Sequence, residues 1–175
     1  MTDDQIRENL VGQGWGEKDV MSVLTPNMAT ATQNTILKKT FIILIPVLWI
    51  IALFLPAYIF PPSAYDSKQA TYFGYDCLLW GWAGGGIAFI AWISNLPWLI
   101  SYILLASKKS ARKKSIVFAG IAFALSLSAL TTTELLRDEA GHTGQVNASI
   151  GAYVWILSML TLLIGNIILY KIKSN

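Results

Sequence analysis

Four long apolar runs, separated by short polar segments, dominate the pattern of this sequence. They cover residues 41–60, 78–106, 116–130 and 150–170. A helix needs about 20 apolar residues to cross a hydrocarbon core about 30 Å thick, and the first and last runs provide them. The third run is short, but Ser115 and the threonines at 131–133 extend it because their hydroxyls return hydrogen bonds to the helix backbone. The pattern therefore predicts transmembrane helices at about 41–60, 78–106, 115–133 and 150–170.

The second run is longer than one crossing requires and contains helix-breaking residues. It has 29 residues and carries three consecutive glycines and Asn95-Leu96-Pro97. Two crossings would need roughly 40 residues, whereas one straight helix of this length would be about 43 Å long. Pro97 cannot donate a hydrogen bond to the carbonyl of Ile93, so we expect one overlong crossing with a kink.

Three interpretations of this kink stay open. It is a bend satisfied by helix packing, a broken helix that lines a binding cavity as in transporters, or an interfacial re-entrant segment. In the second case Trp92, Asn95 and Pro97 are the candidate contacts.

Lysine and arginine give an independent test of the topology. If each run crosses once, nine of the lysines and arginines close to the runs fall on one side of the membrane: Lys38, Lys39, Lys108, Lys109, Arg112, Lys113, Lys114, Lys171 and Lys173. Only Lys68 and Arg137 fall on the other side. Cytoplasmic loops carry an excess of such residues, so both termini are expected in the cytoplasm. A double crossing by the second run gives the weaker division of eight against three.

Small residues at four-residue spacing predict where the helices pack together, because helix backbones approach closely at such positions. The candidates are Gly81, Gly85, Gly120, Ala124, Ser128 and Gly165. None of the four apolar runs contains Asp, Glu, Lys, Arg or His, the groups that mark ion and proton paths in membranes. We therefore expect an all-α integral membrane bundle of four helices, the second one kinked, rather than a wide pore.

The segment before the first run predicts a small cytoplasmic domain. Asp3 or Asp4 can cap a first helix that ends at Gly12 and Gly14, and a second short helix starts at about residue 17. Trp15 lies at the joint, where it can close the two helices against each other and contact a partner. The hairpin is loosely similar to ubiquitin-associated domains, which implies a docking element. The expected organisation is a hairpin at 1–25, a flexible Thr- and Asn-rich linker at 26–39 and a transmembrane domain at 40–172.

Composition excludes several classes of protein. Hydrophobic residues make up 54% of the chain and charged residues 13%, whereas soluble domains carry about 25% charged residues. The acidic, polar N-terminus is unlike a cleaved signal peptide. Cys77 is the single cysteine, which rules out an intrachain disulfide and a redox pair. With no catalytic, phosphate-binding or zinc-binding motif, we expect no enzyme, no cofactor and no nucleic-acid partner.

The loop before the last run concentrates most of the charge expected outside the cell. Its charged residues and histidine are Glu134, Arg137, Asp138, Glu139 and His142. A helical turn here would place Arg137 beside acidic partners, and Arg137, Asp138 and His142 are candidate partner contacts. One histidine beside two acids is also a weak signal for a metal or for acid–base chemistry.

Two segments resemble a family of small bacterial multi-pass inner-membrane proteins of unknown function. An Asp-Glu-x-Gly loop leads into a Gly-x-Tyr-x-Trp-x-x-Ser helix start, here Asp138, Glu139, Gly141, Gly151, Tyr153, Trp155 and Ser158. The second signature is formed by Cys77, Leu78, Leu79, Gly81, Trp82, Trp92, Asn95 and Pro97, and it departs from the family in having Leu96 before the proline. The resemblance implies a four-helix architecture in a bacterial inner membrane and supplies no activity.

Three functions follow from these observations. We favour a non-enzymatic inner-membrane protein that contacts another membrane or cytoplasmic protein, or a second copy of itself, as an accessory, regulatory or immunity protein. The alternative is a small transporter or channel subunit that uses the broken second helix. A membrane enzyme that uses Glu134, Asp138, Glu139 and His142 is the least favoured.

Overall fold

The computed structural model describes residues 2–62, 70–83, 86–107, 112–136 and 142–174, with backbone only at residues 3, 22–31 and 173–174. The chain divides into two units, Met1–Thr40 and Phe41–Asn175. The helices are α1 (Asp3–Gly12), α2 (Glu17–Leu53), α3 (Gly74–Trp80), α4 (Gly86–Ile93), α5 (Asn95–Ala106), α6 (Arg112–Ser126), the 3-10 helix η1 (Leu127–Thr131) and α7 (Ile150–Ser174). The strands are β1 (Pro56–Phe60), β2 (Ala70–Phe73), β3 (Glu134–Leu136), β4 (Thr143–Gln145) and β5 (Asn147–Ala148).

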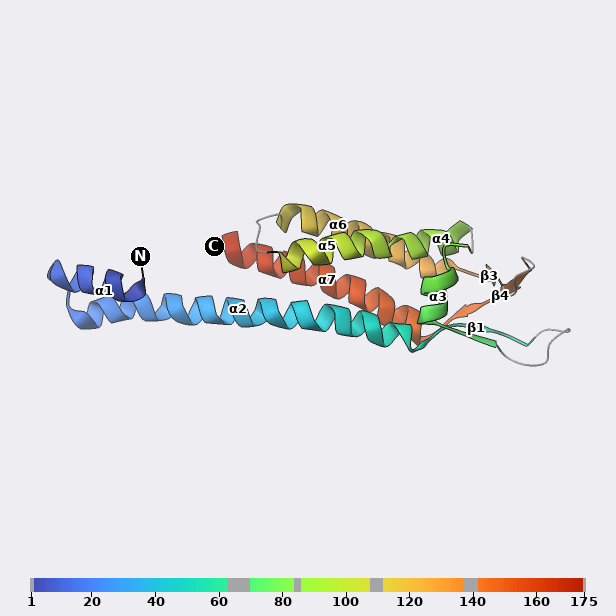
Figure 1. Ribbon diagram of the computed structural model, residues 1–175, viewed down its shortest axis with the longest axis horizontal. Helices are drawn as coiled ribbons and strands as arrows, with labels where there is room; N and C mark the ends of the chain where they lie inside the picture. Colours follow the sequence, from blue (N-terminus) through green and yellow to red (C-terminus); the bar gives the residue numbers. More distant parts are fainter. Residues whose placement is uncertain (1, 63–69, 84–85, 108–111, 137–141, 175) are drawn as a thin grey trace. The chain divides into compact units, whose positions relative to one another are not determined.

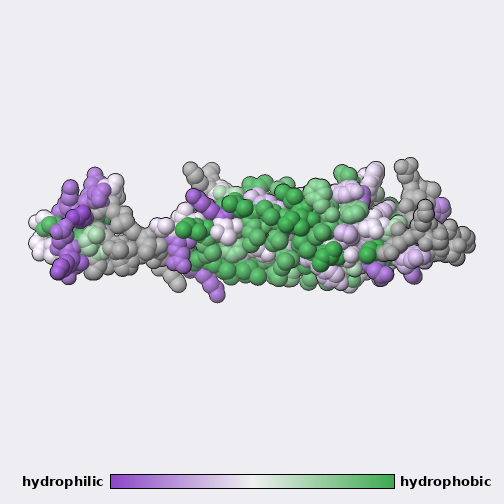
Figure 2. All heavy atoms as spheres, turned by 90° about the horizontal axis from the view of Figure 1, so that it is seen from below, coloured by the Kyte–Doolittle hydropathy of each residue, from purple (hydrophilic) through white to green (hydrophobic). Residues whose placement is uncertain are grey.

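Four helical segments of the described chain are long and apolar enough to cross a membrane. They are Thr32–Leu53, Gly86–Ala106, Arg112–Thr131 and Ile150–Ile172. Figure 2 shows apolar side chains covering the surface over these helices. The last segment has the largest share of buried residues, 44%, and the first the smallest, 11%. Helices α5, α6 and α7 pack against one another, and Figure 1 shows them side by side.

The second apolar run is divided differently from our expectation. Its first residues belong to the separate helix α3, which ends before Gly81, so that the segment of membrane-crossing length starts only at Gly86. That segment has 21 residues and would be about 32 Å long, close to the thickness of a hydrocarbon core. The excess length of the run is therefore a short helix outside the crossing.

Ser94 separates α4 from α5, near the position where a kink was expected. The amide of Ser94 donates to the carbonyl of Ala91 at 3.2 Å, and the amide of Trp98 donates to the carbonyl of Ser94 at 3.1 Å. Pro97 is the third residue of α5 and lies in its first turn. Amide groups in a first turn have no partner within their own helix, so the proline is tolerated there.

The all-α prediction is wrong in one respect, because the chain also forms short strands. Strand β1 pairs antiparallel with β2 and with β5, and β3 pairs antiparallel with β4. We had assigned residues 56–60 to the first transmembrane helix. Pro56 disfavours the helical conformation at the residue before it, and the Tyr-Ile-Phe sequence that follows favours a strand. The strands lie at the end of the second unit where α2 ends and α7 begins (Figure 1).

The N-terminal unit also differs from the prediction in detail. Thr2, not Asp3 or Asp4, caps α1: its side chain accepts from the amide of Gln5, whose side chain accepts from the amide of Thr2 at 2.9 Å. An ion pair between Arg7 and Glu17 joins α1 to the start of α2. Trp15 is 54% exposed and therefore does not close the hairpin.

Residues 26–39, expected to be a flexible linker, are helical and belong to α2. Neither glycine nor proline occurs between Asn27 and Ile45. After nucleation, each added residue of a helix contributes one hydrogen bond. The low helix propensity of Thr and Asn is therefore insufficient to end α2 in this segment.

Buried hydroxyl and amide groups join three helices in the second unit. The Ser101 hydroxyl of α5 donates to the carbonyl of Ser115 in α6 at 2.9 Å, and the Ser115 hydroxyl donates back to the carbonyl of Ser101 at 2.9 Å. Asn166 of α7 donates to the Ser101 hydroxyl at 3.3 Å. All three residues are fully buried, so these bonds join α5, α6 and α7 inside the second unit.

A different bond links α5 to α2. The Tyr102 hydroxyl donates to the carbonyl of Ile42 at 3.0 Å. This carbonyl would normally accept from the residue four positions later, which is Pro46 and has no amide hydrogen. Tyr102 thus replaces the hydrogen bond that the proline removes.

The small residues that are buried in α6 are not the ones that we selected. The buried set is Ser115, Ala119, Ala122 and Ser126, followed by Ala129 in η1. Ala124 is exposed, Ser128 donates to the carbonyl of Leu125, and a Cβ atom on Gly120 would meet no atom within 4 Å. Gly165 does lie at a close contact, since its Cβ would come within 2.8 Å of Phe41. Gly81 contacts Trp92 in the same way, at 3.0 Å, and Gly85 lies outside the described residues.

Candidate functional site

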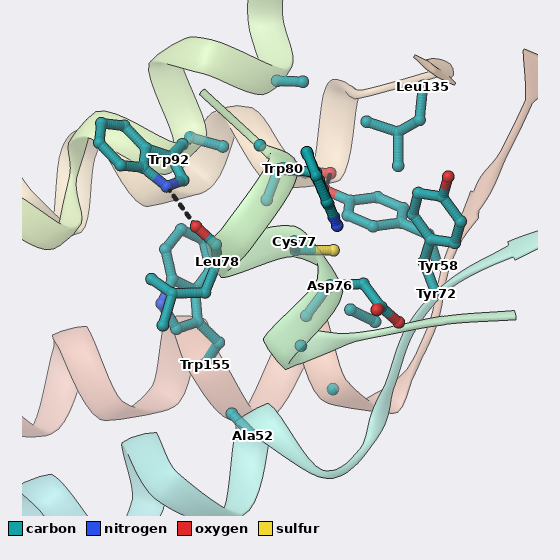
Figure 3. Close-up of a pocket in the computed structure, with 18 of the residues that line it drawn as sticks. Ala52, Tyr58, Tyr72, Asp76, Cys77, Leu78, Trp80, Trp92, Leu135 and Trp155 are labelled. Atoms are coloured by element: carbon teal, nitrogen blue, oxygen red, sulfur yellow. Dashed lines mark hydrogen bonds between the residues drawn. The ribbon is translucent and has the colours of Figure 1, made fainter. Parts of the chain in front are cut away.

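A cavity of about 550 Å³ lies where the four long helical segments meet the strands. It is lined by the end of α2, strands β1 and β2, helix α3, helix α4, the end of η1 and the start of α7. Its aromatic lining consists of Trp49, Tyr58, Tyr72, Trp80, Trp92 and Trp155 (Figure 3). Alanine and leucine side chains form most of the remaining wall. A concave site of this size and composition is typical of small-molecule binding.

Two glycines allow the elements around the cavity to approach one another. A Cβ atom on Gly74 would lie 2.2 Å from the carbonyl oxygen of Ala52, and one on Gly151 would lie 2.7 Å from that of Leu55. The first glycine starts α3 and the second lies at the start of α7. Because backbone atoms cannot move aside as a flexible side chain can, both positions require glycine. They bring α3 and α7 against the segment that joins α2 to β1.

Asn95 ties three helices together at the edge of the cavity. Its Oδ1 accepts from the indole nitrogens of Trp49 in α2 and Trp155 in α7, both at 3.2 Å. Its Nδ2 donates to the carbonyl of Trp92, one turn earlier, at 2.9 Å. Trp92 in turn donates from its indole nitrogen to the carbonyl of Leu78 in α3 at 2.8 Å. Asn95 therefore fixes the side chains of Trp49 and Trp155 by direct hydrogen bonds, and its bond to the backbone of Trp92 connects it to a third tryptophan of the cavity.

Burial favours the neutral forms of Cys77 and Tyr58 in the cavity wall. It raises the pKa of the Cys77 thiol from its ordinary value of 9.0 to about 12, and the neighbouring Asp76 carboxylate adds to the increase. It also raises the pKa of Tyr58 from 10.0 to about 12. The Tyr58 hydroxyl donates to the carbonyl of Ala129 at 2.8 Å. A neutral thiol is a weak nucleophile, so this wall favours binding over covalent chemistry.

Asp76 is the charged residue of the described cavity lining. One of its carboxylate oxygens, Oδ2, accepts from the amide of Phe73 at 3.0 Å, at the start of α3. Figure 3 shows Asp76 and Cys77 on the side of α3 that faces Tyr58 and Tyr72. The carboxylate therefore belongs to the polar end of a mainly apolar cavity.

The structure brings some of the predicted contacts together and not others. Trp92 and Asn95 line the cavity, whereas Pro97 lies beyond it in the first turn of α5. Trp15 belongs to the N-terminal unit. His142 is exposed and comes directly before β4, while Arg137 and Asp138 lie outside the described residues. Among the residues that the structure describes, no group of three His, Cys, Asp or Glu side chains could hold a metal ion.

A helical turn at residues 134–138 would have placed Arg137 beside acidic partners, but the described part of this segment, Glu134–Leu136, is strand β3. Glu134 pairs with Gln145 across the β3–β4 ladder, and Leu135 pairs with Gly144. Leu135 is buried in the same cluster as Tyr58, which explains why this segment is extended rather than helical.

Sequence reasoning missed Tyr58, Tyr72 and Asp76 as parts of the site. Two signals were available: Pro56 marks the end of the first helix, and an acid three residues after Phe73 is a capping pattern for a new helix. Neither signal alone indicates that the strands and α3 enclose a cavity.

No family model, no curated protein and no solved structure matches this chain. The interpretation of the cavity therefore rests on its geometry and chemistry.

Proposed function

We propose that the protein is a non-enzymatic, four-span membrane protein that binds a small apolar molecule in the cavity beneath its strands. Both termini face the cytoplasm in this proposal, because the lysine and arginine distribution favours that orientation. The cavity then lies at the outer boundary of a bacterial inner membrane. An accessory, regulatory or immunity role stays a prediction, and the cavity would be the ligand-binding site of a protein with that role.

The observation that carries the proposal is the cavity itself. Its volume of about 550 Å³ falls within the range of about 300–1,000 Å³ that small-molecule sites occupy. Trp49 and Trp155 donate to the side chain of Asn95, and Trp92 donates to the carbonyl of Leu78, so these three rings are already in position before a ligand binds. Preformed walls lower the cost of ordering side chains upon binding.

The described chemistry of the wall supports binding rather than catalysis. Cys77 carries a thiol that stays protonated at neutral pH, and the described lining holds no histidine or lysine that could remove its proton. The bonding of Asn95 also weighs against the transporter alternative. Its amide already accepts two hydrogen bonds and donates one, so transport through the break would require these bonds to exchange.

Photolabelling in proteoliposomes tests this proposal. We would label the protein with a neutral twelve-carbon alcohol that carries a diazirine, and map the adducts by mass spectrometry. Peptides containing lipid-facing residues provide the internal reference, because the probe also dissolves in the bilayer.

A cavity-filling variant separates the site from the lipid background. Ala88 is buried in the cavity wall, so Ala88→Leu should reduce labelling of the cavity peptides by at least about tenfold. The matched control, Ala124→Leu, changes an exposed alanine in α6 and should leave that labelling unchanged. Cavity peptides labelled no more than lipid-facing ones, and equally in both variants, would overturn the proposal.

A further inference from the structure

We infer that the cavity selects a singly charged cationic amphiphile, with its cationic head beside Asp76 and its apolar body among the tryptophans. This inference rests on the proposed function and adds the charge of the ligand to it. The first step concerns the charges that line the site. Asp76 is acidic, and the described lining contains no lysine, arginine or histidine. Among the described lining residues, Asp76 is therefore the one charged side chain, and no described lining residue carries an opposite charge.

The other ionisable groups nearby do not alter that balance. Tyr58 and Cys77 both stay protonated at neutral pH, because burial favours their neutral forms. Asp76 directly precedes Cys77 in α3, and both residues line the cavity, so the carboxylate lies on the same part of the wall as the thiol. An anionic ligand would meet like charge beside Asp76, whereas a cation would meet opposite charge.

The aromatic residues favour the same class of ligand. Trp80, Tyr72 and Tyr58 lie around the end of the cavity that holds Asp76 (Figure 3). The faces of tryptophan and tyrosine rings attract cations, most strongly where the site excludes water, and such rings recognise quaternary ammonium groups. A carboxylate beside aromatic rings therefore complements a weakly hydrated organic cation better than a metal ion, which requires several oxygen ligands.

The rest of the cavity complements an apolar body. Ala52, Ala88, Ala91 and Ala152 are buried residues of the cavity wall, and their small side chains leave room for an apolar group. The ligand that fits both ends thus has one cationic head and one alkyl or aromatic body.

Three twelve-carbon competitors with different heads test the inference in the photolabelling assay. They are dodecyltrimethylammonium, dodecanol and laurate, each used below its micellar concentration. In the wild-type protein, dodecyltrimethylammonium should displace the cavity label at about tenfold lower concentration than dodecanol, and laurate should be the weakest competitor. This comparison needs no variant, so it stands even if a substitution prevents folding.

Asp76→Asn tests the residue that the inference names. The asparagine oxygen can still accept from the amide of Phe73, so the start of α3 is preserved while the charge is lost. The preference for the cation over the alcohol should disappear in this variant. It should persist in the control Glu134→Gln, which removes an exposed acid from β3 outside the cavity lining.

The outcomes distinguish this inference from the proposed function. Equal competition by the cation and the alcohol, or a cation preference that survives Asp76→Asn, overturns the inference and leaves the apolar binding site intact. Failure of all three competitors to displace the cavity label overturns both proposals.

Discussion

Replacing Asn95 by leucine should lower the free energy of unfolding by about 1–3 kcal/mol. The substitution removes the acceptor of two interhelical hydrogen bonds, from Trp49 and Trp155, each 3.2 Å long. Hydrogen bonds between membrane helices contribute about 0.6 kcal/mol on average and up to about 1.7 kcal/mol each. Leucine has the same branching and the same number of non-hydrogen side-chain atoms as asparagine, so it leaves no void, and the loss comes mainly from the unpaired indole nitrogens.

The assay is reversible unfolding in mixed micelles, with increasing dodecyl sulfate and far-ultraviolet circular dichroism as the readout. Trp49→Phe and Trp155→Phe, alone and combined with Asn95→Leu, complete two double-mutant cycles. Each cycle should give a coupling energy of about 0.6 kcal/mol, because the phenylalanine variants remove the same bonds from the other side. A change below about 0.3 kcal/mol for Asn95→Leu, or strict additivity in both cycles, would show that these bonds do not hold the helices together.

Three further predictions concern the cavity wall and its surroundings. Gly151→Ala should destabilise the protein by about 1–3 kcal/mol, because the new Cβ would lie 2.7 Å from the carbonyl oxygen of Leu55. The control Gly120→Ala has open space around its Cβ and should be neutral or slightly stabilising. Equal unfolding midpoints of the two variants would contradict this prediction. At pH 8 the Cys77 thiol should react with a maleimide about 1,000-fold more slowly than an exposed cysteine, because its raised pKa leaves little thiolate. The reference is Thr143→Cys in a Cys77→Ala protein, since Thr143 is exposed. Comparable rates measured by mass spectrometry would refute the burial of Cys77. The folded state binds the Cys77 proton more tightly than the unfolded state, because the pKa of the thiol is raised from 9.0 to about 12. The contribution of this proton to stability is therefore complete below pH 9 and is lost at up to about 1.4 kcal/mol per pH unit as the pH rises towards 12. Unfolding measured against pH should show a steeper alkaline loss of stability in the wild type than in Cys77→Ala, and parallel curves would disprove the linkage.

The four helical segments could be predicted from the sequence because their length and lack of charge are decisive on their own. Their ends could not be, because short-range signals compete there with apolar composition. Residues 56–60 continue an apolar run without a break in hydropathy, and only Pro56 indicates that the helix has stopped. The same ambiguity hid α3, whose leucines and tryptophan were counted as part of the crossing.

The packing face of α6 shows a second limit of sequence reasoning. Gly120, Ala124 and Ser128 are spaced as a contact stripe should be, but so are Ala119, Ala122 and Ser126. A membrane helix is apolar on every side, so hydropathy does not distinguish its buried face from its lipid-facing one. The serines that bond across helices would have been the better guide, since a hydroxyl in lipid needs a partner.

The cavity could not be predicted because residues from several separated elements form it. Trp49, Tyr72 and Trp155 lie far apart in the sequence and line the same cavity only in the folded structure. Asn95 was singled out as a polar residue in an apolar run, which was a sound reason to expect an interhelical role. Its partners depend on the packing of α2 and α7 and could not be inferred from spacing.

The bond between Tyr102 and Ile42 has a consequence for how α5 is aligned along α2. In an uninterrupted helix each carbonyl is already paired, so a tyrosine on a neighbouring helix finds similar surroundings at every turn. Pro46 frees the carbonyl of Ile42 and thereby marks one turn of α2 as different from those beside it. A displacement of α5 by one turn, about 5.4 Å, would leave both the hydroxyl and this carbonyl unpaired in lipid. The proline therefore encodes the axial position of the neighbouring helix, a property that apolar side chains alone specify poorly.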